Sequence, residues 1–228
     1  MIVLDDADVA KAASAGAWGS FLHQGQICMT TGRHIVHESL YDDYVERLAG
    51  KAAHLPVGNP ATTEVALGPV IDASQRDKIH DRVTASQNAG AKVVAGGNYE
   101  QLFYQATVLA DVPPASPAFA EEVFGPVAPV VAYSSIDDAV HIAADTEYGL
   151  ALGIVTRDIM RGLDVAEKIP SGIVHINDQT VSDEANIPFG GVGASGTGVR
   201  FGGPAANVDA FTDTQWVTVR SEPPPYPF

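Results

Sequence analysis

The sequence is poor in cysteine and in positive charge. A single cysteine among 228 residues cannot form a disulfide bond within the chain. With 13 basic against 28 acidic residues, the formal net charge of -15 opposes binding to nucleic acid or to anionic lipid surfaces. We therefore expect no nucleic-acid partner and no membrane partner, and a ligand that is neutral or that meets a local basic spot.

Long apolar runs are also missing. No run approaches the roughly 20 residues that a helix needs to span a bilayer. The segment from Met1 to Asp6 lacks the basic and apolar regions of a signal peptide. We expect a soluble, cytoplasmic protein, whose 46% of hydrophobic residues suffices for one sizeable core or two small ones.

The only cysteine lies in a segment that glycines bracket, from Gly25 to Arg33. Glycine allows backbone conformations that other residues avoid, and it lets a ligand approach the sulfur. Cys28 could therefore be a catalytic nucleophile, because a thiolate attacks readily once its pKa is lowered. Alternatively it is a small buried hydrophobe, as many free cysteines are. The glycines and the polar Gln26, Thr30 and Thr31 favour an accessible loop.

Short apolar strands alternate along the chain with helices of about ten to fifteen residues. This alternation predicts an α/β fold, with an open, mostly parallel sheet and helices on both faces. The nearly continuous apolar run 127–133 suits a strand that is covered on both sides. Capping residues are expected at Ser39, at Asp72 or Ser74, and at Ser135. Strands are predicted at 2–4, 33–37, 91–95, 104–109, 127–133, 151–156, 172–176 and 214–220, and helices at 9–21, 39–53, 72–88, 135–145 and 158–169.

Ligands of such sheets lie beyond the carboxyl ends of the strands, where we expect the loops at Glu122 and Asn177 to emerge. His34 and His37 suggest a metal site, but no third ligand stands at a suitable spacing. The glycine-rich run 190–203 neither follows a strand directly nor opens a clear helix, which disfavours a nucleotide-binding fingerprint. We expect no metal site.

Three motifs, in this order along the chain, resemble those of the aldehyde dehydrogenase superfamily. They are Gly25-Gln26-Ile27-Cys28 with Gly32-Arg33, then Glu121-Glu122-Val123-Phe124-Gly125-Pro126, then Pro188-Phe189-Gly190-Gly191 running into Ser195-Gly196-Thr197-Gly198. The resemblance covers almost the whole chain and is to the C-terminal, catalytic-domain half of the family. The segment from Ile176 to Glu184 is similar to the benzaldehyde, vanillin and salicylaldehyde dehydrogenase branch.

The resemblance implies a role for each motif. Cys28 would attack the aldehyde carbon, and a thioester would form when NAD or NADP takes up the hydride. Glu122 would bind the ribose hydroxyls of the cofactor, and Phe124 would pack against its nicotinamide. The backbone N–H of Cys28 would stabilise the oxyanion, together with an asparagine upstream of Met1. An apolar aldehyde pocket would be lined by Leu22, Ile27, Met29 and Phe189.

The chain also departs from the family. It has no Glu-Leu-Gly-Gly motif, whose glutamate is the family's general base, and Val199-Arg200 stands where many relatives have Arg-Glu. We therefore expect a piece that lacks the dinucleotide-binding half and is inactive alone. Residues 1–210 would form the catalytic domain, 211–220 a strand of the oligomerisation arm, and 221–228 a proline-rich tail.

The expected function is oxidation of an aromatic or otherwise apolar aldehyde to the acid, by a homo-oligomer (dimer or tetramer) in the full-length form. The alternatives are an inactive truncated or structural assembly module, and an aldehyde dehydrogenase that passes the acyl group to coenzyme A.

Overall fold

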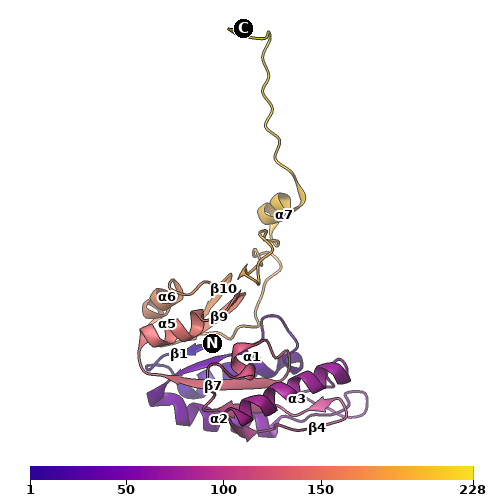
Figure 1. The fold of residues 1–228 in the computed structure, drawn as a ribbon, viewed down its shortest axis with the longest axis vertical. Coiled ribbons are helices and arrows are strands. Elements are labelled where there is room, and N and C mark those ends of the chain that lie inside the picture. Colours follow the sequence, from indigo (N-terminus) through magenta and orange to yellow (C-terminus); the bar gives the residue numbers. More distant parts are fainter. Residues whose placement is uncertain (228) are drawn as a thin grey trace.

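A seven-stranded sheet runs through the computed structural model, which describes residues 1–227 (Figure 1). The strand order is β10-β9-β1-β2-β7-β6-β3, and every neighbouring pair is parallel except β3 with β6. The strands are β1 (Ile2–Val3), β2 (His34–His37), β3 (Lys92–Ala95), β6 (Thr107–Ala110), β7 (Val127–Tyr133), β9 (Ala151–Val155) and β10 (Ile173–Ile176). The mostly parallel α/β sheet predicted from the sequence is confirmed.

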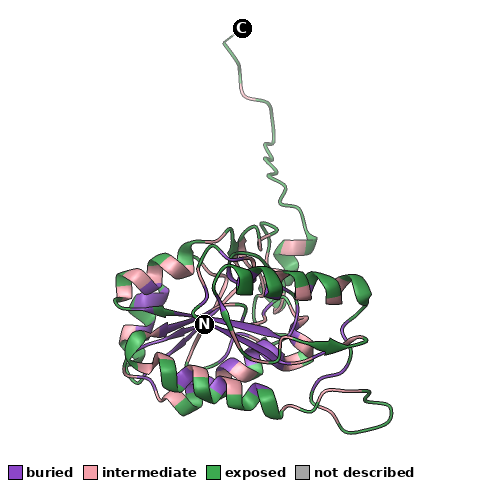
Figure 2. Ribbon diagram, turned by 60° about the horizontal axis from the view of Figure 1, so that its bottom comes forward, coloured by how far each residue is buried: buried purple, intermediate pink, exposed green. Residues whose placement is uncertain are grey.

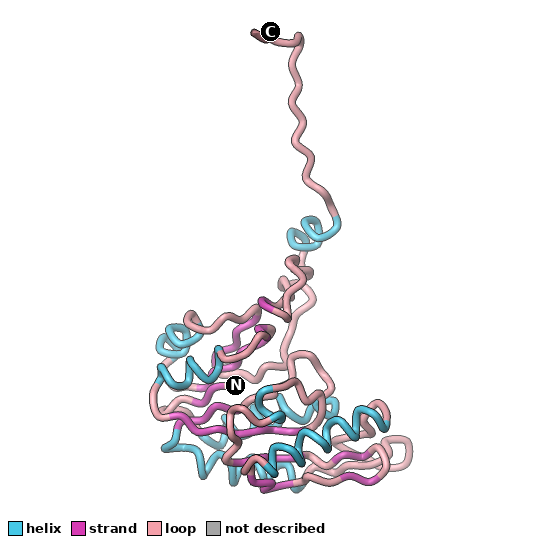
Figure 3. Tube along the Cα trace, viewed as in Figure 1, coloured by secondary structure: helices cyan, strands magenta, loops and turns pink. Residues whose placement is uncertain are grey.

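Helices cover both faces of the sheet, and two small two-stranded sheets lie outside it (Figure 3). The helices are α1 (Val9–Phe21), α2 (Tyr41–His54), α3 (Ala73–Asn88), α4 (Pro117–Ala120), α5 (Ile136–Ala144), α6 (Ile159–Ala166) and α7 (Pro204–Phe211), with 3-10 turns at Leu22–Gly25 and Glu38–Leu40. The small sheets pair β4 (Tyr99–Glu100) with β5 (Phe103–Tyr104), and β8 (Tyr148–Gly149) with β11 (Val192–Gly193). The strand predicted at 104–109 is therefore divided between β5 and β6.

Side-chain caps fix most of the helix starts. Asp8 accepts hydrogen bonds from the backbone N–H groups of the first turn of α1, and Asp72 and Ser135 do the same for α3 and α5. The predicted cap at Ser39 is wrong. Residues 38–40 form a 3-10 turn capped by the His37 ring, and α2 begins only at Tyr41 without a side-chain cap.

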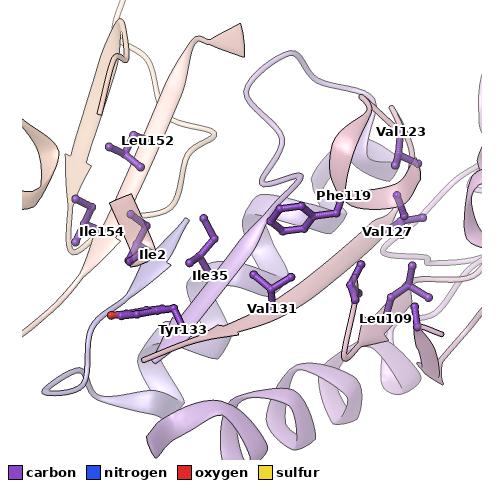
Figure 4. Close-up of a cluster of buried hydrophobic side chains, with 14 of the residues drawn as sticks. Ile2, Ile35, Leu109, Phe119, Val123, Val127, Val131, Tyr133, Leu152 and Ile154 are labelled. Atoms are coloured by element: carbon purple, nitrogen blue, oxygen red, sulfur yellow. The ribbon is translucent and has the colours of Figure 1, made fainter. Parts of the chain in front are cut away.

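The core consists of two apolar clusters, one on each face of the sheet (Figure 2). Because side chains alternate along a strand, Ile2 belongs to the cluster that contains residues of α3 to α6, and Val3 belongs to the cluster that contains residues of α1 and α2. Figure 4 shows the first cluster, where Ile35, Val131 and other strand residues meet Phe119 of α4. Burial on both faces explains why β7 is apolar almost throughout.

Asp6 ties together two loops at the carboxyl edge of the sheet. Its carboxylate accepts hydrogen bonds from Thr156 Oγ1 at 2.8 and 2.9 Å, from Arg157 N at 2.9 Å and from Asp158 N at 3.0 Å. Burial alone would raise the pKa of Asp6, but these hydrogen bonds and the charge of Arg161 outweigh it, so the pKa lies below its ordinary value.

The C-terminal segment leads away from the sheet (Figure 1). Residues 212–227 contain no helix or strand, and Trp216 is 91% exposed. The strand predicted at 214–220 is not formed, because no strand of the described chain lies beside it to provide backbone partners. Phe228, the end of the predicted proline-rich tail, lies outside the described residues. None of the helices within residues 1–227 has the length and hydropathy of a membrane span.

Candidate active site

The loops that hold Cys28 and Glu122 meet at the amino edge of the sheet. The Cys28 loop (residues 25–33) leads into β2, and the Glu122 loop (residues 121–126) leads into β7. Since β2 and β7 are parallel neighbours, both loops approach the sheet from the same side. The predicted site at the carboxyl ends of the strands is therefore wrong, and only Asn177, which follows β10, lies at that edge.

A cleft of about 210 Å³ opens between these two loops and the amino ends of β1 and β9. Among the residues predicted for the site, those that line it are Ile27, Cys28, Met29, Glu122 and Phe124. Leu22 and Phe189 are not part of its lining. Leu22 is half-buried in the 3-10 turn after α1, and the Phe189 ring packs against Phe201 with a centroid distance of 5.6 Å. The chain thus brings the cysteine together with the second motif, whereas of the third motif only Ser195 lines the cleft.

Three residues with left-handed backbone conformation lie shortly before Cys28. After α1 ends, His23, Gln24 and Gly25 have φ angles of 50°, 59° and 64°, which reverses the direction of the chain. The Cys28 side chain is exposed. Its backbone N–H donates no hydrogen bond within residues 1–227, so a donor beside the sulfur is free for a ligand.

The backbones of the Cys28 loop and the Glu122 loop come into close contact at Gly25. A Cβ on Gly25 would overlap the carbonyl oxygen of Gly125, so two backbones meet where only glycine fits. The Glu122 loop is also held by Gln75 of α3, whose Nε2 donates to the carbonyls of Val123 at 3.1 Å and Phe124 at 2.9 Å. Phe124 adopts a φ of 53°, which is uncommon for a residue with a side chain, and the residue is 37% exposed.

The two glutamates of the second motif have different surroundings. Glu121 forms an ion pair with Arg82 of α3 at 3.0 Å. Glu122 is exposed and has neither an ion-pair nor a hydrogen-bond partner in the described part of the chain. The carboxylate of Glu122 is therefore available to a ligand in the cleft.

Arg33 connects the two loops through side-chain hydrogen bonds that could not be predicted from the sequence. Its Nε donates to the carbonyl of Phe119 at 2.7 Å, and its Nη1 to the carbonyl of Asp145 at 3.0 Å. The guanidinium also lies 4.7 Å from the centre of the Phe119 ring. Because Phe119 lies just before Glu121, these contacts connect the end of the Cys28 loop to the start of the Glu122 loop.

His34, whose residue type suggested a metal ligand, is a buried hydrogen-bonded residue. Its Nδ1 lies 2.7 Å from the Tyr44 hydroxyl, and its Nε2 lies 2.7 Å from Ser20 Oγ. Burial is the main cause that lowers the pKa of His34 to about 3, so the ring is neutral near pH 7. The His37 ring bonds to Ser39 instead, through Nδ1. In residues 1–227 no group of three or more His, Cys, Asp or Glu side chains is placed to hold a metal ion.

An exposed thiol, a free N–H and a free carboxylate share one cleft of an α/β sheet. Groups of these types could together support attack by a cysteine on a bound electrophile. Residues 1–217 match the sequence profile of the aldehyde dehydrogenase family. This chain belongs to that family.

Its relatives include enzymes that are named for aromatic aldehydes. The chain is 67% identical to a vanillin dehydrogenase of Amycolatopsis sp., over all of this chain and 47% of that protein. It is 50% identical to the NAD(+) benzaldehyde dehydrogenase of Pseudomonas putida, over all of this chain and 46% of that protein. A crystal structure of a salicylaldehyde dehydrogenase from Pseudomonas putida G7, complexed with salicylaldehyde, superposes with a TM-score of 0.94 at 40% identity, over all of this chain and 47% of that one. The chain thus spans about half the length of the curated relatives it matches.

Proposed function

We propose that this chain supplies the nucleophile and part of the cofactor site of an NAD(P)-dependent aldehyde dehydrogenase that converts an aromatic aldehyde to its carboxylic acid. The observation that carries this proposal is the exposed Cys28 thiol in a cleft that also contains the unpaired Glu122 and the Phe124 ring. The names of the relatives support the aromatic substrate class.

Chemistry begins at the sulfur. The Cys28 thiolate adds to the carbonyl carbon of the aldehyde, forming a carbon–sulfur bond and placing the electron pair of the C=O bond on oxygen. The free N–H of Cys28 can donate to this oxyanion as it forms. One such donor typically contributes about 3 kcal/mol to lowering the barrier.

The side chains of the cleft fit a nicotinamide dinucleotide. A carboxylate such as Glu122 can accept hydrogen bonds from two ribose hydroxyls, and the exposed ring of Phe124 offers a flat apolar surface to the nicotinamide. A bound dinucleotide would supply the hydride acceptor, and loss of a hydride from the thiohemiacetal carbon would leave a thioester on Cys28. The choice between NAD and NADP does not follow from these two residues.

Hydrolysis of the thioester then releases the acid and frees the thiol. The general base that the family uses belongs to a Glu-Leu-Gly-Gly motif, and the sequence contains no such motif. The apolar Ile27 and Met29 flank the nucleophile on the lining of the cleft, and they suit an aldehyde with an apolar body.

The test pairs two substitutions at the site with a matched control in the native protein. Cys28→Ala should lower aldehyde turnover by at least about 1,000-fold, measured by the absorbance of the reduced nicotinamide, because the covalent route is lost. Glu122→Gln should raise the KM for the dinucleotide. Glu121→Gln is the matched control at the neighbouring carboxylate, which is paired with Arg82 rather than free for a ligand, so it should leave that KM unchanged.

Turnover that survives Cys28→Ala would refute the proposal. A native protein that is folded but turns over no aromatic aldehyde with either dinucleotide would instead favour a structural module. Turnover that requires coenzyme A would favour the acylating alternative.

A further inference from the structure

We propose that Tyr44, His34, Ser20 and Thr180 are positioning residues, which hold the backbone that follows Cys28 through two buried chains of hydrogen bonds. One chain ends on the carbonyl of Thr31, and the other ends on the carbonyl of Met29. The inference rests on the proposed role of Cys28, since what these residues would position is the nucleophile.

The direction of the first chain follows from counting protons. Ser20 Oγ lies 2.8 Å from the carbonyl oxygen of Thr31, which can only accept, so the single hydroxyl proton of Ser20 points there. Ser20 must then accept from His34 Nε2 at 2.7 Å. The neutral ring is left with an unprotonated Nδ1, which accepts from the Tyr44 hydroxyl at 2.7 Å. The order is therefore Tyr44 to His34 to Ser20 to the backbone at Thr31.

The second chain is resolved in the same way. Thr180 Oγ1 donates to the carbonyl of Met29 at 2.6 Å. It must therefore accept from Thr31 Oγ1, which lies 2.7 Å away. Thr180 lies a few residues after β10, yet it bonds to the Cys28 loop, which lies about 150 residues earlier in the sequence.

The hydroxyls and the ring in these chains are shielded from solvent. Relative exposure is 0% for Ser20, His34 and Tyr44, 1% for Thr31 and 2% for Thr180. Every polar atom within the chains has a partner, so water is not needed to complete them. Cys28 is exposed in the cleft, and Thr31 and Thr180 reach the lining of the same cleft, so the second chain of hydrogen bonds lies directly behind the nucleophile's loop.

Helix α1 leaves room for these groups at two points. A Cβ on Gly16 would overlap the Tyr44 hydroxyl, and a Cβ on Gly19 would overlap Thr31 Oγ1. Glycine inside a helix lowers its stability, so its presence at both points is accounted for by the polar groups that it admits.

These side chains form their hydrogen bonds with one another and with backbone carbonyls, and none of these bonds is to the Cys28 sulfur. They act through the backbone on the orientation of the Cys28 sulfur and N–H, and orientation of a nucleophile affects the chemical step more than substrate binding. Loss of one hydrogen bond at a carbonyl should therefore lower kcat and leave the KM for the aldehyde nearly unchanged.

The experiment compares Thr180→Val with Thr180→Ser in the native protein. Valine keeps the shape and removes the hydroxyl, whereas serine keeps the hydroxyl. We expect Thr180→Val to lower kcat roughly tenfold and to slow alkylation of Cys28 by iodoacetamide, with KM within about twofold. Thr180→Ser should restore both rates. Thr156→Val, which removes a buried hydroxyl that donates to Asp6 at the carboxyl edge of the sheet, away from the cleft lining, should lower stability but not kcat.

The first chain provides a second set of variants, in case Thr180→Val fails to fold. Tyr44→Phe and Ser20→Ala interrupt the same chain, so the double variant should lose no more kcat than Ser20→Ala alone.

Three results would overturn the inference. The first is that the variants lose thermal stability but keep the wild-type kcat and the wild-type rate of Cys28 alkylation. The second is equal losses for Thr180→Ser and Thr180→Val. The third is fully multiplicative losses for Tyr44→Phe and Ser20→Ala. If Cys28→Ala itself retains turnover, it is the proposed function that fails, and the two failures are thereby distinguished.

Discussion

Replacing Gly25 by alanine tests whether the Cys28 loop and the Glu122 loop are in direct backbone contact. Two separate costs are expected. An L-residue at the left-handed φ of 64° costs about 1 to 2 kcal/mol relative to glycine. The new Cβ would also overlap the carbonyl oxygen of Gly125 and lie 2.9 Å from that of Ser20. Such overpacking typically costs a further 1 to 3 kcal/mol or so. The free energy of unfolding should fall by about 2 to 5 kcal/mol.

Gly32→Ala is the matched control within the same loop. The φ of Gly32 is not positive, and a Cβ there would meet no atom closer than the Thr30 carbonyl oxygen at 4.0 Å. Its effect should stay within about 0.5 kcal/mol.

Urea denaturation followed by far-UV circular dichroism is the appropriate assay for this pair. Fluorescence is less informative, because Trp18 and Trp216 are 57% and 91% exposed in the folded chain. If Gly25→Ala and Gly32→Ala unfold at the same urea concentration with the same slope, the two loops are not in contact at Gly25. The structural account of how Cys28 and Glu122 reach one cleft would then be wrong.

Two further predictions concern the carboxyl edge of the sheet and the C-terminal segment. Because hydrogen bonds hold the pKa of Asp6 below its ordinary value, the stability that this carboxylate contributes is present above about pH 4 and is lost as the pH falls through its folded pKa. Asp6→Asn should therefore lower the free energy of unfolding by about 1 to 2 kcal/mol near pH 7, and the difference from wild type should shrink in urea titrations at about pH 3. A difference that is constant between the two pH values would contradict this. Deleting the residues after Phe211 should change the free energy of unfolding by less than about 0.5 kcal/mol, because residues 212–227 are almost all exposed. The same deletion should reduce the self-association that we expect from exposed apolar groups such as Val219, and unchanged light scattering would refute it.

Local features of the fold could be read from the sequence. The caps at Asp72 and Ser135 lie next to the backbone groups that they satisfy, so a few consecutive residues carry the signal. Strand β7 was predicted with its observed bounds, because burial on both faces leaves a continuous apolar run in the sequence itself. The family likewise follows from short motifs, and the sequence profile confirms it.

The arrangement of the site could be read only in part. The sequence singled out Cys28, Glu122 and Phe124, and the fold places all three on one cleft. The order of the motifs does not show at which edge of the sheet two loops meet. That depends on whether each loop precedes or follows its strand, and here both loops precede their strands. The edge was therefore predicted wrongly, and Phe189 lies against Phe201 rather than on the cleft lining.

Tertiary structure alone decided which polar side chains are paired. His34 drew attention in the sequence as a metal ligand, yet its partners are Ser20 and Tyr44, which contact it only after α1 and α2 pack on the same face of the sheet. The distinction between a paired Glu121 and an unpaired Glu122 depends on where α3 places Arg82. The alternating pattern at 214–220 fixes a preference for extended backbone, but a strand exists only where a neighbouring strand offers hydrogen-bond partners, and those come from the assembled fold.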